Sequence, residues 1–188
     1  MKTQTLFALA LAPQLALLAG LVVREEHARA TGTEVVLEVR AYDPMDPLSG
    51  RYIRVPLAIA RIELADVKHQ GPLPEQGSIV YVRLEKREKQ WEPIELCAQE
   101  PDAALGPFLR ARRELRWASD TTNFVQLDYE LDRFYISEKA NDPTGFVNGQ
   151  WQAHALKVVV RVTGAGRGAI TDLLVDGQPY AEWNRAQR

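Results

Sequence analysis

The sequence has one cysteine, Cys97, among its 188 residues. A single thiol closes no disulfide within the chain, and it does not supply the paired cysteines of a zinc site. Histidine is also scarce, and His27, His69 and His154 share no spacing that is typical of metal ligands. The sequence therefore predicts no metal and no cofactor. With 46% apolar residues, it favours one domain that is held together by a hydrophobic core.

Acidic residues are absent before Glu25, and Lys2 is the only charged residue before Arg24. Beyond position 23 the chain carries 22 basic and 25 acidic residues, a net charge of −3. Phosphate backbones repel a mildly acidic domain, so the composition argues against a nucleic-acid partner.

Residues 6–23 form an uncharged run, LFALALAPQLALLAGLVV, in which Gln14 is the only strongly polar side chain. An 18-residue helix rises about 27 Å, which is close to the roughly 30 Å hydrocarbon core of a bilayer. The polar residues that follow, from Arg24 to His27, are a poor context for signal-peptide cleavage. A soluble surface helix would show a polar stripe, which this run does not. The pattern favours an uncleaved transmembrane helix over these two alternatives.

This interpretation divides the chain into two parts. Residues 1–30 are predicted to be a membrane anchor and a short polar stalk, and residues 31–188 a β-rich extracytoplasmic domain. Positive charges on the two sides of the run are nearly balanced, so they do not decide the orientation. A short tail before the run and a large domain after it favour a single-pass protein of the cytoplasmic (inner) membrane. The domain is then expected on the periplasmic or extracellular side, with the lipid bilayer around residues 6–23.

After Gly32 the apolar period changes from helical to two. Val35, Leu37 and Val39 alternate with polar residues, as in a half-buried strand. Similar runs cover residues 52–64, 78–85, 91–97, 108–117, 123–136, 156–162 and 169–175. The expected fold is mainly β, a small barrel or sandwich of roughly eight short strands preceded by one N-terminal transmembrane helix.

Several local signals refine this expectation. Pro56 predicts an edge position or a break in the ladder within residues 52–64, and a phase shift near Ala60 suggests a bulge. The glycine-rich residues 163–168 favour a hairpin turn over a phosphate loop, because a strand and not a helix follows them. A short helix is expected only within residues 145–156.

Two blocks of the sequence resemble a known family. The apolar run is followed by TEVVLEVR and by a loop, Asp43-Pro-Met-Asp46-Pro, that leads into Gly50-Arg51-Tyr52. A later block, YELDRFYI at residues 129–136, is similar to the family's second block. This arrangement resembles the GDYXXLXY family of membrane-anchored bacterial proteins. The resemblance implies an envelope location and a β-rich fold, but no reaction.

The signature octet departs from the family pattern. Residues 50–57 read GRYIRVPL, so the glycine and the first tyrosine match. Arg51 stands in place of the aspartate, Val55 in place of the leucine, and Leu57 in place of the second tyrosine. Roles that need this carboxylate or this second phenol are therefore not expected here.

The candidate binding residues come from these two blocks. The two carboxylates of the loop have no third ligand nearby, and Asp-Pro units commonly form turns, so a turn is favoured over a cation site. The glycine is expected to let the chain reverse into a strand on which the tyrosine packs. The candidate contact surface or signature loop consists of Asp43, Asp46, Gly50, Arg51, Tyr52 and Tyr135.

No catalytic constellation stands out. The sequence favours a membrane-tethered β-domain that acts by contact, as a non-catalytic accessory or assembly partner of a larger polytopic membrane protein. The alternative is an envelope-associated hydrolase of the Ser–Lys type, for which Ser49 and Lys157 are candidates without a motif to join them.

Arg110, Arg112 and Arg116 share one face of a predicted strand, where they suit either cross-strand ion pairs or anionic lipid headgroups.

Overall fold

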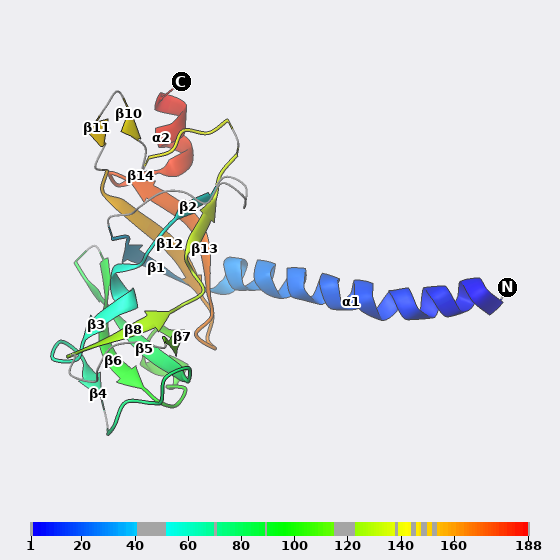
Figure 1. Ribbon diagram of the computed structural model, residues 1–188, viewed down its shortest axis with the longest axis horizontal. Helices are drawn as coiled ribbons and strands as arrows, with labels where there is room; N and C mark the ends of the chain where they lie inside the picture. The colour runs from blue at the N-terminus through cyan, green and yellow to red at the C-terminus, as the bar shows by residue number, and fades with distance from the viewer. Residues whose placement is uncertain are drawn as a thin grey trace.

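The computed structural model describes residues 2–40, 52–69, 71–88, 90–114, 123–137, 139–143, 146–147, 150–151 and 154–187. Within these ranges the side chains of residues 2–8, 10, 24–25, 28, 146–147 and 150–151 are not described. A long helix precedes a β-rich domain and extends away from it (Figure 1).

The N-terminal helix α1 (Lys2–Thr31) includes Pro13 and ends directly before Gly32. The helix therefore continues through the polar residues that follow the apolar run. In the last turn the Thr31 hydroxyl donates to the carbonyl oxygen of His27 at 2.8 Å. The large apolar side chains of the helix that are described are exposed, from 38% for Leu11 to 73% for Leu9.

Among the described residues, no helix combines the length and the apolarity that a membrane crossing needs. The predicted span began at Leu6, but the side chains of residues 6–8 and 10 lie outside the described set. The expectation of a transmembrane helix over residues 6–23 is thus not confirmed, although the helical conformation is.

One antiparallel sheet has the order β1-β12-β13-β14. The predicted hairpin between the last two long strands is confirmed, because β12 and β13 pair from Leu156↔Val175 to Val162↔Gly168. The predicted inward residues Val35 and Leu37 are fully buried. The four strands are β1 (Thr33–Glu38), β12 (Leu156–Val162), β13 (Gly168–Val175) and β14 (Gln178–Pro179).

A second sheet has the order β3-β8-β7-β5-β6-β4 and curves into half a barrel. All of its pairs are antiparallel except β4 with β6. The expected mainly β fold is confirmed. The six strands are β3 (Arg61–Glu63), β4 (Lys68–His69), β5 (Ile79–Arg87), β6 (Gln90–Cys97), β7 (Phe108–Arg113) and β8 (Phe124–Asp128).

Smaller elements complete the domain. Strand β2 (Tyr52–Arg54) pairs with β9 (Arg133–Tyr135), and β10 (Phe146–Val147) pairs with β11 (Gln150–Trp151). Two 3-10 turns, η1 (Ala58–Ala60) and η2 (Ala103–Leu105), and a short C-terminal helix, α2 (Tyr180–Ala186), lie between or after the strands.

Two predicted strands are each divided in two. Residues 52–64 form β2, the turn η1 and β3 in place of one bulged strand. Pro56 has no N–H for a ladder, and its carbonyl oxygen accepts from the N–H of Arg40. The run at residues 123–136 becomes β8 and β9, because Glu130 between them has a φ of 57°, outside the strand region.

The short helix that was expected within residues 145–156 lies elsewhere in the chain. Strands β10 and β11 lie within that segment and pair in antiparallel register, with Phe146 opposite Trp151. The short helix is instead α2, which buries Tyr180 and Trp183 at a spacing of three residues.

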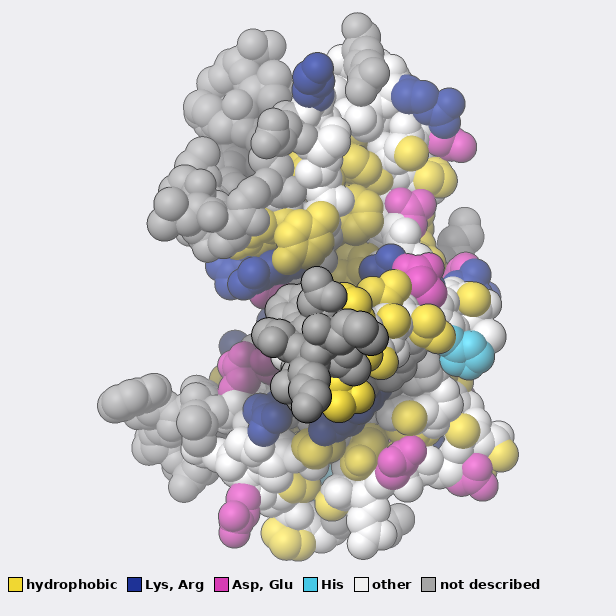
Figure 2. Space-filling model, turned by 90° about the vertical axis from the view of Figure 1, so that its right-hand side faces the viewer, with side chains coloured by type: hydrophobic (Ala, Val, Ile, Leu, Met, Phe, Trp, Pro, Cys, Tyr) yellow, Lys and Arg dark blue, Asp and Glu magenta, His cyan; other side chains and the backbone are white. Residues whose placement is uncertain are grey.

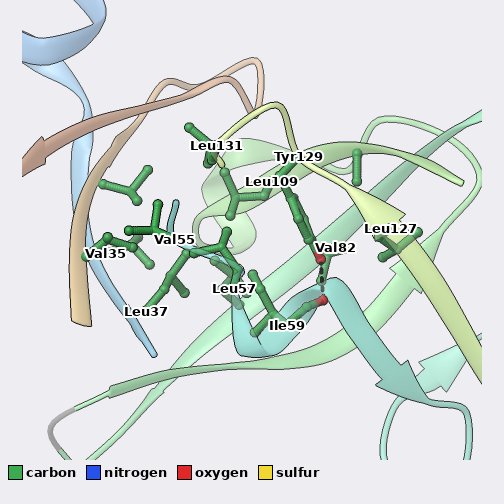
Figure 3. Packing of buried hydrophobic residues seen from close by; sticks show 14 of the residues in the cluster. Val35, Leu37, Val55, Leu57, Ile59, Val82, Leu109, Leu127, Tyr129 and Leu131 are labelled. Carbon is green, nitrogen blue, oxygen red and sulfur yellow. Dashed lines mark hydrogen bonds between the residues drawn. The ribbon is translucent and has the colours of Figure 1, made fainter. Parts of the chain in front are cut away.

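The hydrophobic core joins both sheets (Figure 3). Side chains of β1, of the segment at residues 55–59 and of the half-barrel strands pack together, and Val35, Val55 and Val82 are completely buried. Within this core the hydroxyl of Tyr129 donates to the carbonyl oxygen of Ile59 at 3.0 Å. No polar or charged residue is otherwise buried in the part of the chain that is described.

Candidate functional site

The two blocks that carry the family resemblance lie side by side. Strands β2 and β9 pair in antiparallel register, with Tyr52 opposite Tyr135 and Arg54 opposite Arg133. The ladder continues where the N–H of Val55 donates to the carbonyl oxygen of Asp132 at 2.8 Å. The octet and the second block are therefore strand partners.

Three side chains meet on the outer side of this strand pair and form what we call the Tyr–Arg cluster: Tyr52, Tyr135 and Arg133. The two phenol rings are tilted by 55° with centroids 6.0 Å apart. The Arg133 guanidinium lies 5.0 Å from the centroid of the Tyr52 ring, a cation–π distance. Tyr135 is 68% exposed, so much of the cluster is open to contact.

The cluster carries a permanent positive charge. A side-chain hydrogen bond with Tyr135 and the nearby Asp132 carboxylate raise the pKa of Arg133 above its already high value. Asp132 lies 3.4 Å from the guanidinium and partly compensates this charge. The cluster therefore presents a guanidinium and two phenols, groups that can form hydrogen bonds with a bound partner.

The opposite side of the strand pair is anchored in the core. Ile53 is buried, and the half-buried Phe134 packs edge-on against Tyr180 with ring centroids 5.6 Å apart. Because side chains alternate along a strand, this anchoring directs Tyr52 and Tyr135 outward. The fold thus holds the cluster in one orientation.

The structure brings two of the predicted site residues together, namely Tyr52 and Tyr135. Asp43, Asp46, Gly50 and Arg51 lie outside the described residues, as do Ser49 and Arg116. Sequence reasoning missed Arg133, although it lies inside the second block, because its partner on the other strand was unknown.

Two of the three altered positions of the octet lie in the core. Val55 and Leu57, which stand in place of the family's leucine and second tyrosine, are both buried. Both are apolar and occupy apolar surroundings. The departures at these two positions are therefore compatible with a packing role.

A cavity of about 490 Å³ lies beside the Tyr–Arg cluster. Arg133 and Tyr135 line it together with Arg29 of α1 and Thr171 of β13. The cluster is thus close to the point where α1 leaves the domain.

Lys157 of β12 contacts side chains of two other strands. Its side-chain nitrogen lies 3.8 Å from a carboxylate oxygen of Glu38 in β1 and 3.5 Å from the side-chain oxygen of Gln90 in β6.

A histidine–carboxylate pair that sequence reasoning missed lies at the turn after β13. Nδ1 of His154 is 2.5 Å from one oxygen of Asp176, and the N–H of Ala155 donates to the other at 2.9 Å. The hydrogen bond with His154, and to a smaller extent that with Ala155, holds the pKa of Asp176 below its usual value. His154 also packs edge-on against Trp183, so the pair fixes the turn against α2.

Metal-binding groups do not gather within the described ranges. No three His, Cys, Asp or Glu side chains among the described residues are placed to hold a metal ion. Burial and the nearby Glu95 raise the pKa of the Cys97 thiol, which disfavours its reactive thiolate form.

Comparison with known proteins gives one match. A family model described as GDYXXLXY protein covers residues 14–173, which is most of the chain and includes both blocks. No curated protein and no solved structure matches. The resemblance inferred from the sequence is confirmed.

Proposed function

The chain belongs to the GDYXXLXY family, and we propose that it attaches a β-rich domain to a cell-envelope membrane. There the domain acts as a non-catalytic accessory or assembly partner of a larger membrane protein. The observation that carries this proposal is the exposure of the apolar side chains of α1.

The apolar side chains of α1 point in all directions around the helix. Successive helical residues are separated by about 100°, so Leu17, Leu18 and Val23 lie roughly 100–140° from one another around the helix axis and share no stripe. A helix that is apolar all round suits a lipid environment better than a one-sided groove. Burial of each large side chain is worth about 1.5–3 kcal/mol. The exposed set is Leu9, Leu11, Leu15, Leu17, Leu18, Leu21, Val22 and Val23.

We place the domain on the periplasmic or extracellular side. The large folded domain after the apolar stretch supports this side, because long domains are translocated largely regardless of their charge. Protease added to intact spheroplasts tests it. Digestion of the domain supports an extracytoplasmic location, and protection would place the domain on the cytoplasmic face.

The Tyr–Arg cluster is the contact surface that we assign to the partner. Tyrosine and arginine are enriched among the residues that dominate binding energy at protein interfaces. The cluster is held on a strand pair with an anchored inner side, and Arg29 of α1 lines the adjacent cavity. A partner that reaches this surface would therefore lie beside the membrane attachment.

Membrane attachment is tested by extracting isolated membranes with alkaline carbonate. We expect the wild-type chain to stay with the membranes. Leu17→Arg should release much of it, because a cation near the centre of an inserted helix costs about 2.5–3.5 kcal/mol. The matched control is Leu105→Arg, at a leucine of the domain that is 61% exposed, and it should stay bound. Equal release of both variants, or of the wild type, contradicts the proposal.

The partner is tested by cross-linking the full chain in cells, followed by detergent extraction and mass spectrometry. One dominant polytopic membrane protein supports an accessory role. Recovery of the chain alone at native expression contradicts it.

A further inference from the structure

A cavity of about 680 Å³ lies where α1 joins the domain. His27 of α1 lines it together with Arg110 and Arg112 of β7 and with Arg167, which precedes β13. Figure 2, in which α1 points toward the viewer, shows Lys and Arg side chains beside the helix where it leaves the domain. This cavity, with its three arginines, is called the arginine cavity below.

The fold forces these arginines together. Along β7, Arg110 and Arg112 flank the buried Ala111 and so share the opposite side of the strand. The N–H of Arg110 donates to the carbonyl oxygen of Gly166 at 2.7 Å, which ties the tip of the β12–β13 hairpin to β7. Arg167 is the next residue, and it lies beside the other two for this reason.

The positive charge of the cavity is incompletely compensated. The side chains of Arg110 and Arg167 form no ion pair or hydrogen bond with any described residue, and Arg112 donates to a neutral group, the Gly77 carbonyl, at 3.0 Å. Asp128 and Glu130 also line the cavity. Three guanidiniums and two carboxylates leave one positive charge in excess, which a monoanion would neutralise.

The cavity also lies at a suitable depth, if α1 is inserted as proposed above. His27 follows Val23, the end of the apolar stretch, by four residues, or about 6 Å of helix. The polar headgroup layer on each side of the hydrocarbon core is about 5–7 Å thick. The phosphate of a lipid headgroup would therefore lie at the same depth as the cavity.

We propose that the arginine cavity binds the phosphodiester group of an anionic phospholipid headgroup. Guanidinium groups match phosphate oxygens in two-pronged hydrogen bonds. An anionic headgroup brings this phosphodiester with a net charge of −1, whereas a choline headgroup adds a cation that leaves the excess positive charge of the lining in place. This inference rests on the proposed attachment of α1 to a membrane. It adds recognition of a lipid class and fixes how the domain is oriented on the surface.

The test uses the full chain and two kinds of vesicle, phosphatidylcholine alone and phosphatidylcholine with a third of phosphatidylglycerol. We expect the wild type to bind both, and the anionic vesicles more tightly. Arg110→Gln and Arg167→Gln should each reduce that preference about fivefold without changing the affinity for neutral vesicles. Arg185→Gln, the same charge change at an exposed site of α2, is the matched control and should behave as wild type. Unchanged circular dichroism establishes that the variants fold.

Each outcome has a distinct meaning. Failure of the wild type to bind neutral vesicles contradicts the attachment of α1, and an equal affinity for the two kinds of vesicle contradicts the headgroup site alone. Equal losses in Arg167→Gln and Arg185→Gln show general charge attraction and overturn the site. Soluble inorganic phosphate that abolishes the anionic preference of the wild type at millimolar concentration would assign the cavity to free phosphate instead. Arg167→Lys, which keeps the charge without the planar fork, should retain part of the preference.

Discussion

The hydroxyl of Tyr129 donates a hydrogen bond to the carbonyl oxygen of Ile59 at 3.0 Å, and both residues are buried. This bond joins the start of the second block to the turn that follows the octet. Burial raises the pKa of Tyr129 far above its usual range, so the phenol remains a protonated donor. The bond and the β2–β9 ladder hold the two blocks together on either side of Glu130.

Removal of this hydrogen bond should destabilise the domain. In Tyr129→Phe the Ile59 carbonyl loses its partner inside the core, which costs about 1–3 kcal/mol of unfolding free energy. Urea denaturation that is monitored by circular dichroism measures this loss of unfolding free energy. Tyr135→Phe, at a largely exposed phenol, is the control and should change stability little. Equal effects would show that the buried bond contributes nothing of its own.

The close approach of the hairpin tip to β7 requires glycine. Gly166 has a φ of 74°, and a Cβ there would lie 2.6 Å from the ring of Phe108. Gly177 has a similar φ of 82° but open space around it. Gly177→Ala should therefore cost about 1–2 kcal/mol from backbone strain alone. Gly166→Ala should cost about 1–3 kcal/mol more, because Phe108 must move. Equal unfolding free energies for the two variants would contradict this contact.

Stability at the turn after β13 should depend on pH. Because the folded state lowers the pKa of Asp176 from 3.8, its contribution is present above that value and is lost as pH falls through the folded-state pKa. Asp176→Asn should therefore lower the melting temperature at neutral pH, and the difference from wild type should shrink in acid. In a His154→Ala background the effect should be smaller, since His154 is the first cause of the shift. A difference that does not vary with pH would show that the carboxylate charge is not involved.

The Tyr–Arg cluster should matter for contact and not for stability. Tyr135→Ala is expected to reduce cross-linking to the membrane partner at least fivefold, about 1 kcal/mol or more of binding free energy, while the melting temperature stays near wild type. Leu105→Ala removes another exposed apolar side chain of the domain and should leave cross-linking intact. Unchanged cross-linking in Tyr135→Ala would move the contact surface elsewhere.

Local pattern was sufficient for much of the fold. Alternation identified the buried face of β1, and the change of period after Gly32 marked the end of α1, because periodicity and helix termination depend on neighbouring residues. The break at Glu130 was missed, whereas the one at residues 58–60 was predicted, as a break at Pro56 or a bulge near Ala60. The apolar run continues through Glu130, and only the packing of the segments on either side sets the backbone there.

The candidate site shows the same division. The sequence by itself determined the family, the mainly β class, and Tyr52 and Tyr135 as residues of interest. Only the tertiary structure decided that these tyrosines are cross-strand neighbours with Arg133 beside them, and that Arg167 joins Arg110 at the base of α1. Residues so far apart in the chain meet because strands pair and a hairpin tip docks on β7. Such long-range contacts depend on how the whole core packs, and no local pattern encodes them.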